Sequence, residues 1–151
     1  GVDGASFDRN GDGEVDEDEM DELIQRRVFS ITEADFDAMR RLGYDDVSTD
    51  DLVAAKIHGV DPAFVRAIRD EGYRPTLDEL VGLRVVGVDR AYIRDLTSLG
   101  LGELSLEDLV QLRVVGVDKA YVLALRKAGV KKPSVERIVE LRALGIVPKA
   151  P

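Results

Sequence analysis

Three letters, Gly-Val-Asp, recur along this chain at 59–61, 87–89 and 116–118, and Gly145-Ile146 follows one period later. The period is 28 or 29 residues, and most positions in between also match, as in VDPAFVRAIRDEGYRPTLDELVGLRVVG and VDRAYIRDLTSLGLGELSLEDLVQLRVVG. Such a period is typical of chains in which each repeat buries its apolar face only against its neighbours. We therefore divide residues 31–145 into four repeats, 31–59, 60–87, 88–116 and 117–145, followed by a tail that ends at residue 151.

Each repeat carries start and stop signals for two short helices. The start signals are N-cap residues, whose side-chain oxygens can accept an unpaired backbone N–H. They are Thr32, Asp61, Asp89 and Asp118 for the first helices and Ser48, Thr76, Ser105 and Ser134 for the second helices. The stop signals are glycines suited to a left-handed C-cap. They are Gly43, Gly72, Gly100 and Gly129 after the first helices and Gly59, Gly87, Gly116 and Gly145 after the second. We predict an all-α fold, a short right-handed stack of αα-hairpins resembling an α-solenoid.

Apolar residues recur at fixed places in the repeats, and we expect them to form the core. Three of these places hold large side chains in most repeats: Met39, Ile68, Leu96 and Leu125; Leu52, Leu80, Leu109 and Ile138; Ala55, Leu83, Leu112 and Leu141. A fourth holds only alanine, where we expect helices to approach closely: Ala34, Ala63, Ala91 and Ala120. Helices of about ten residues are marginal alone, so the repeats must stack to be stable.

Residues 8–19, DRNGDGEVDEDE, precede the repeats and have a different character. Side-chain oxygens fall at positions 1, 3, 5, 9 and 12 of this stretch, at Asp8, Asn10, Asp12, Asp16 and Glu19. Gly13 is at position 6, where a sharp bend needs a positive φ. The stretch resembles the loop of an EF-hand, and the resemblance implies a Ca²⁺ site. The expected ligands are Asp8, Asn10, Asp12, the backbone carbonyl of Glu14, both carboxylate oxygens of Glu19, and Asp16 directly or through a water.

The calcium loop is expected to continue into one helix over residues 16–27, so that residues 1–30 form an N-terminal segment. Met20, Leu23 and Ile24 lie at helical spacing, and Arg26 and Arg27 close the helix. A loop with only its exiting helix is also similar to one half of a dockerin. The sequence has no second loop of this kind. The loop is therefore solitary within the chain, truncated, or paired with something else.

The second helices end in a leucine-rich stretch, a basic residue, two more residues and Gly-Val. Three segments show this pattern: Lys56-Ile57-His58-Gly59-Val60, Arg84-Val85-Val86-Gly87-Val88 and Arg113-Val114-Val115-Gly116-Val117. They resemble a short helical repeat of bacterial proteins, which occurs among other places after the metallopeptidase domain of antibiotic-sensor-type membrane proteins. The resemblance implies a repeat scaffold. We expect a bacterial protein, and an extracytoplasmic location, periplasmic or at the surface, is slightly favoured. The resemblance does not carry over a peptidase activity, because the sequence has no HExxH motif.

Composition excludes several functions. The net charge is −9 and no basic stripe occurs, so we expect no nucleic-acid partner. No apolar run approaches about 18 residues, so we expect no transmembrane segment. There is no cysteine, and the single histidine, His58, is interpreted as a packing or capping residue. Ser48, Ser105 and Ser134 are explained as helix caps. We therefore predict no catalytic residue and no enzyme activity.

Two recurring side chains have alternative interpretations. Lys56, Arg84, Arg113 and Arg142 either complement the dipoles of their helices or line a face that could grip an acidic peptide. Tyr44 and Tyr73 share one place in the repeat, and Tyr92 and Tyr121 share another. We expect the tyrosines to be half-buried; on an exposed face they would be anchors for a partner.

The preferred function is a calcium-binding helical-repeat protein that acts as a protein-interaction or regulatory module for a protein or peptide partner. The alternative is a constitutive scaffold domain of a larger surface or membrane-associated enzyme, with a purely structural calcium site. Because EF-hand loops usually pair, we also expect a calcium-dependent homodimer about the loop. The competing outcome is a monomer in which the first repeat covers the apolar face of the helix after the loop.

Overall fold

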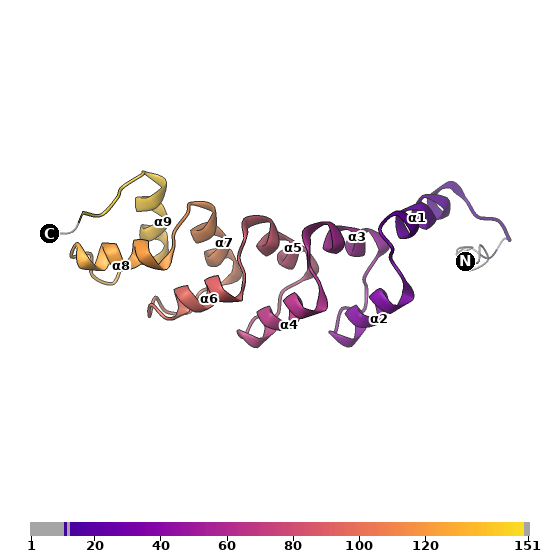
Figure 1. Ribbon diagram of the computed structural model, residues 1–151, viewed down its shortest axis with the longest axis horizontal. Coiled ribbons are helices and arrows are strands. Elements are labelled where there is room, and N and C mark those ends of the chain that lie inside the picture. The colour runs from indigo at the N-terminus through magenta and orange to yellow at the C-terminus, as the bar shows by residue number, and fades with distance from the viewer. Residues whose placement is uncertain (1–10, 12, 150–151) are drawn as a thin grey trace. The chain divides into compact units, whose positions relative to one another are not determined.

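The computed structural model describes residue 11 and residues 13–149, and this part of the chain forms nine α-helices and no strand (Figure 1). The predicted all-α class is confirmed. None of the helices in the described ranges is long and apolar enough to cross a membrane.

The chain divides into two compact units, with the boundary between Pro62 and Ala63. The first unit holds α1 (Glu17–Val28), α2 (Glu33–Arg41) and α3 (Thr49–His58), and α1 packs against α3. The second holds the remaining helices, except that α4 begins with the last residue of the first unit. They are α4 (Pro62–Asp70), α5 (Leu77–Val86), α6 (Arg90–Thr97), α7 (Leu106–Val114), α8 (Lys119–Lys127) and α9 (Val135–Ala143). Within the second unit α7 packs against both α5 and α9.

The helices begin where the N-cap signals placed them. The hydroxyl groups of Ser48, Thr76, Ser105 and Ser134 each accept the backbone N–H three residues later, at 3.0–3.1 Å. The carboxylates of Asp89 and Asp118 do the same at 2.8 and 2.7 Å. Thr32 starts α2, and its N–H donates to Asp35 Oδ2 at 2.8 Å. Local hydrogen bonding therefore fixes the helix starts.

The predicted glycines follow the helix ends with left-handed torsions, at φ values between +69° and +97°. After each second helix, the residue that follows the glycine donates its N–H to the carbonyl five residues earlier, which is the bond of a Schellman motif. These pairs are Val60 to Ala55, Val88 to Leu83, Val117 to Leu112 and Ile146 to Leu141, at 2.8–3.0 Å. Ile31 donates to Arg26 in the same way, so α1 ends as the second helices of the repeats do.

The core contains most of the predicted places but not the alanines. The large side chains of the first two places are at most 3 % exposed, and Ala55, Leu83 and Leu112 are also buried. The expected close approach at the alanines is wrong, because Ala34, Ala63, Ala91 and Ala120 are all exposed. They are the second residues of their helices, and the residues that turn inward come later in the first turn. The buried ones are Phe36, Phe64, Val65, Ile93 and Val122.

An ion-pair cluster and an apolar surface stand out in the second unit. Glu71, after α4, accepts from Arg90 and Arg94 of α6 at 2.8 Å each. The Arg90 hydrogen bond is the main cause that lowers the pKa of Glu71, against the opposing effect of its partial burial.

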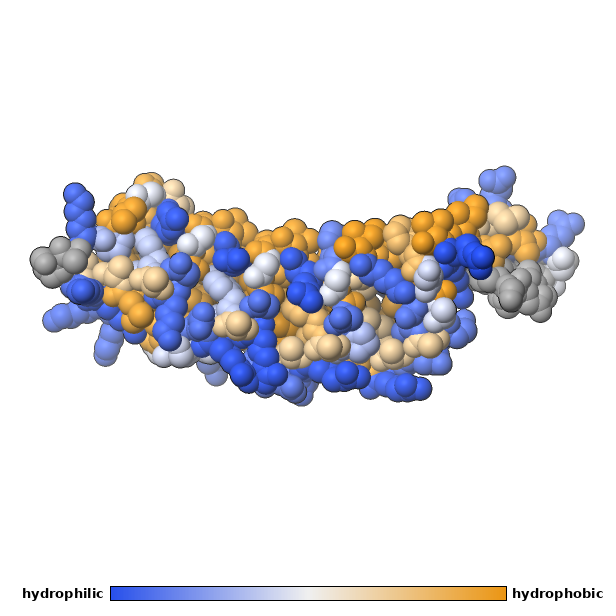
Figure 2. All heavy atoms as spheres, viewed as in Figure 1, coloured by the Kyte–Doolittle hydropathy of each residue, from blue (hydrophilic) through white to orange (hydrophobic). Residues whose placement is uncertain are grey.

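Figure 2 shows apolar side chains gathered over the edge where Figure 1 places α5 and α7. Val85 and Val114, in the last turns of these helices, are 62 % and 65 % exposed.

Candidate functional site

Part of the predicted calcium loop lies in the described residues, and there only the positive φ at Gly13 was expected. Gly13 has a φ of +87°, and Gly11 a φ of +75°. Asp16, at loop position 9, is the N-cap of α1, and its Oδ1 accepts the Glu19 N–H at 2.8 Å. Glu19, at loop position 12, returns a bond, because its Oε2 accepts the Asp16 N–H at 2.9 Å. The loop therefore ends in a capping box that fixes both side chains.

Glu19 is the one charged residue of the described ranges that is buried, with 3 % of its surface exposed. Burying a carboxylate is unfavourable unless hydrogen bonds or a cation compensate it. The donor set and the burial of Glu19 fit a hard cation such as Ca²⁺.

Half of the predicted ligand set can be placed. Glu14, Asp16 and Glu19 lie in the described part of the chain, and Glu14 and Asp16 are exposed. Asp8, Asn10 and Asp12 lie outside the described residues. Among the residues that are described, no three acidic, histidine or cysteine side chains gather in a group that could hold a metal.

The helix after the loop is held against the first repeat through Arg26, which the sequence indicated only as a residue that closes this helix. Its guanidinium lies 4.7 Å from the centre of the Phe36 ring in α2. Its Nε donates to the buried Thr49 hydroxyl at 3.3 Å, and the same hydroxyl donates to Glu22 of α1 at 2.5 Å. Arg26 also pairs with Glu22 and with Glu33 at 3.4 Å. These contacts join α1, α2 and α3.

Each recurring cation of the second helices contacts an aromatic ring or a carboxylate of its own repeat. Arg84 lies 4.2 Å from the ring centre of Phe64, Arg113 5.2 Å from that of Tyr92, and Arg142 5.6 Å from that of Tyr121. Repeat 31–59 differs, because Asp35 replaces the aromatic residue and Lys56 replaces the arginine. Lys56 Nζ forms an ion pair with Asp35 at 3.4 Å and donates to Ser30 O at 3.0 Å. These contacts favour the structural interpretation of the cations over the peptide-gripping one.

The tyrosines are half-buried, as expected; two of them join successive repeats, and Tyr121 joins the last repeat to the tail. The hydroxyl groups donate to backbone carbonyls about one repeat further along: Tyr73 to Leu104, Tyr92 to Val117 and Tyr121 to Ile146, at 2.6–2.7 Å. Burial raises the pKa of Tyr92 to about 12, Asp118 adds to the shift, and Arg113 opposes it. The pKa of Tyr73 is also raised, mainly by burial.

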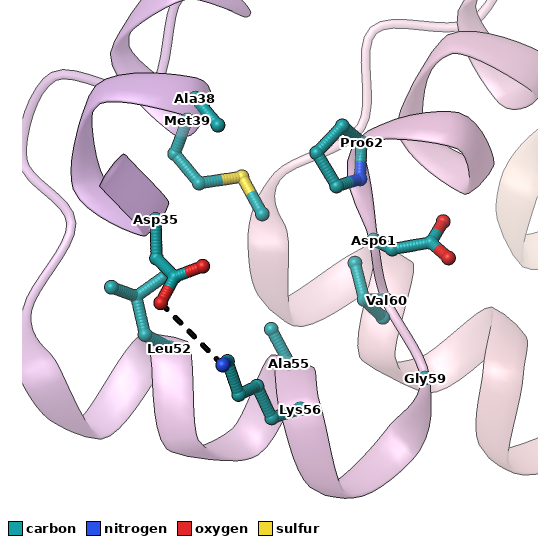
Figure 3. A pocket seen from close by; sticks show the side chains of 10 residues that line it. All are labelled: Asp35, Ala38, Met39, Leu52, Ala55, Lys56, Gly59, Val60, Asp61 and Pro62. Carbon is teal, nitrogen blue, oxygen red and sulfur yellow. Dashed lines mark ion pairs between the residues drawn. The ribbon is translucent and has the colours of Figure 1, made fainter. Parts of the chain in front are cut away.

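A pocket of about 300 Å³ lies between α2 and α3 in the first unit. In Figure 3 Asp35 and Lys56 point toward each other across the gap between the two helices, and Met39 points into it. The other walls are mainly apolar or backbone: Ala38, Leu52, Ala55, Gly59, Val60, Asp61 and Pro62. This pocket was not predicted from the sequence. Its signal was the single departure from the aromatic position of the repeat, at Asp35.

His58 is exposed in the last turn of α3, so it is not a packing residue, and the capping interpretation stays a prediction. Comparison of the chain with protein-family models, with curated proteins and with solved structures finds no match.

Proposed function

We propose that this chain is a calcium-binding helical-repeat protein without enzyme activity, and that it acts as a protein-interaction or regulatory module. The observation that carries the proposal is the buried Glu19 carboxylate at the twelfth place of the loop, with Gly13 at positive φ at the sixth. Asp8, Asn10, Asp12, Glu14 and Glu19 would hold Ca²⁺, with Asp16 direct or through a water. Bound calcium would supply positive charge among crowded carboxylates and link ion binding to the order of α1.

The repeats would form a short stack of αα-hairpins that presents a surface to a protein or peptide partner. The bonds that recur from repeat to repeat support the stack. The exposed apolar side chains Val85, Val114 and Leu144, near the ends of α5, α7 and α9, support an interaction role. The alternative, a constitutive scaffold domain with a purely structural ion, is favoured by the Arg26 contacts, which hold α1 against the first repeat without using the loop.

Isothermal titration of the protein with calcium tests the site. We expect one ion per chain with a dissociation constant on the order of 10⁻⁵ to 10⁻³ M. Glu19→Gln should remove most of the affinity, because it loses the charge while Gln can still complete the capping box. Glu17→Gln is the matched control: it makes the same chemical change at an exposed first-turn residue outside the ligand set. Equal affinity in all three proteins would reject the ligand assignment.

The calcium-dependent homodimer is part of this proposal. Met20 and Ile24 remain 46 % and 53 % exposed although α1 packs against α3, so the first repeat does not cover them fully. Because the loop is rich in carboxylates, two copies should approach only when calcium reduces their repulsion. Sedimentation at several protein concentrations should show stronger dimerisation in calcium than in chelator. A monomer under both conditions would leave the loop as a cap within one chain.

A further inference from the structure

The pocket between α2 and α3 lies where the later repeats place an aromatic ring of their own. Counted from the first residue of each repeat, Asp35 occupies the place of Phe64, Tyr92 and Tyr121. In those repeats a guanidinium covers the ring at 4.2–5.6 Å, and Lys56 occupies the place of that guanidinium. The short Asp35 side chain leaves the space open, and the pocket of about 300 Å³ has Asp35 and Lys56 at its edge.

The backbone carbonyl to which a phenol hydroxyl would donate also recurs along the chain. Tyr92 donates its hydroxyl to Val117 O, the first residue of the next repeat, at 2.6 Å, and Tyr121 donates to Ile146 O, the first residue after the last repeat, at 2.7 Å. The matching residue for the first repeat is Val60, which lines the pocket. An apolar cavity of about 150 Å³ is enough to bind benzene, so size does not exclude a phenol ring.

The net charge of the first unit indicates which residues should flank that ring in a ligand. Residues 1–62 carry eighteen acidic and six basic side chains, a net charge of −12, whereas residues 63–151 carry twelve acidic and fifteen basic side chains, a net charge of +3. A ligand that enters the pocket approaches the strongly acidic unit, so basic residues beside the ring would be favoured. A peptide of this kind would be complementary to the unit as a whole and to the pocket in particular.

We propose that this pocket binds the side chain of a tyrosine in a basic segment of a partner protein. The ring lies among Met39, Leu52 and Ala55, the Lys56 ammonium faces it, and the phenol O–H donates to Val60 O. The partner thus supplies to the first repeat the tyrosine ring that the third and fourth repeats contain themselves. This inference depends on the proposed interaction role but not on the calcium site.

Methionine methyl groups allow a direct test, because the chain has two methionines, Met20 and Met39. Met39 lines the pocket, whereas Met20 lies on α1 outside it. In protein with ¹³C-labelled methionine methyl groups, the peptide acetyl-KKYKK-amide should shift the Met39 signal upfield through the ring current and leave Met20 unmoved. One ring buries little area, so a dissociation constant on the order of 10⁻³ M is expected. The control peptide acetyl-KKLKK-amide should produce no ring-current shift.

A double variant fills the pocket from inside. Thr32→Asp with Asp35→Tyr copies the Asp89 and Tyr92 pair, in which the aspartate caps the helix and the tyrosine spans to the next repeat. It should shift Met39 without any peptide and abolish the response to the tyrosine peptide. Thr32→Asp alone should respond as the parent does.

Several results would overturn the proposal. They are the absence of a Met39 shift at several millimolar tyrosine peptide, equal shifts from both peptides, and a Met39 shift that depends on protein concentration without peptide, which would identify a second copy as the occupant. If the double variant does not fold, the two-peptide titration of the parent protein still decides. The titration is run in calcium and in chelator, so that a pocket response without calcium binding separates this proposal from the metal site.

Discussion

Gly87 shows how tightly one residue can be specified by a neighbour. Its φ is +84°, and a Cβ added there would lie 3.4 Å from the Nε and Nη2 atoms of Arg113. The same guanidinium covers the Tyr92 ring. A side chain at Gly87 would therefore meet both backbone strain and the group that joins α7 to α6.

Gly87→Ala should destabilise the protein by about 1–2 kcal/mol, the cost of a left-handed torsion for a residue with a Cβ, plus any displacement of Arg113. Gly82→Ala is the matched control. Gly82 lies in α5 with nothing within 4 Å of an added Cβ, so alanine should stabilise the helix by up to about 1 kcal/mol. Urea unfolding of both variants measures the difference. Equal changes of the same sign would contradict this assignment.

Residue types predicted the helix starts and ends because these signals are local. A serine or aspartate that caps a helix bonds three residues away, and a glycine at positive φ acts at its own position. The same reasoning failed for Ala34 and its equivalents. A small residue in a repeat indicates close approach only if it faces inward, and the inward direction depends on where in the first turn each residue falls. For the same reason Phe36, Val65, Ile93 and Val122 were not predicted as core.

Between elements, side chains that reach across repeats make the connections that the sequence did not reveal. Arg26 joins α1 to α2 and α3, and Tyr92 joins α6 to the first residue of the next repeat. Each of these contacts depends either on a residue more than twenty positions away or on the direction in which a side chain points. Periodicity shows that residues are equivalent, but it does not show which carbonyl a hydroxyl group reaches.

Tyr92 gives a pH prediction for the link between α6 and the following repeat. Its pKa in the folded protein is raised to about 12, against about 10 for an unperturbed tyrosine. The neutral hydroxyl is therefore favoured by folding. Its contribution to stability is complete below about pH 10 and is lost as the pH rises through about 12.

A spectrophotometric titration should show one tyrosine ionising near pH 12, and Tyr92→Phe should remove that step. The substitution should also cost about 0.5–1.5 kcal/mol at neutral pH, because it removes a hydrogen bond to a backbone carbonyl. The stability difference between parent and variant should shrink above pH 10. A difference that grows with pH would show that the hydroxyl group is not held as the structure describes.

At the scale of the whole chain, the two units differ in charge and in their proposed roles. The acidic first unit contains the proposed calcium loop and the pocket, and the second unit contains most of the repeats. The buried side chains of the second unit, such as Ile68, Leu80 and Leu109, lie far from the loop in sequence. We therefore expect the repeats to remain folded when calcium is removed, while α1 responds to the ion.

The central claim is that calcium binds the loop and orders the helix that follows it, on a scaffold that folds without the ion. Hydrogen exchange of backbone amides, followed by mass spectrometry in calcium and in chelator, tests it most directly. Calcium should slow exchange in the segment from residue 11 to residue 31 and leave residues 77–145 unchanged, and Glu19→Gln should abolish the difference. Identical exchange with and without calcium, or loss of protection throughout the repeats in chelator, would contradict the account.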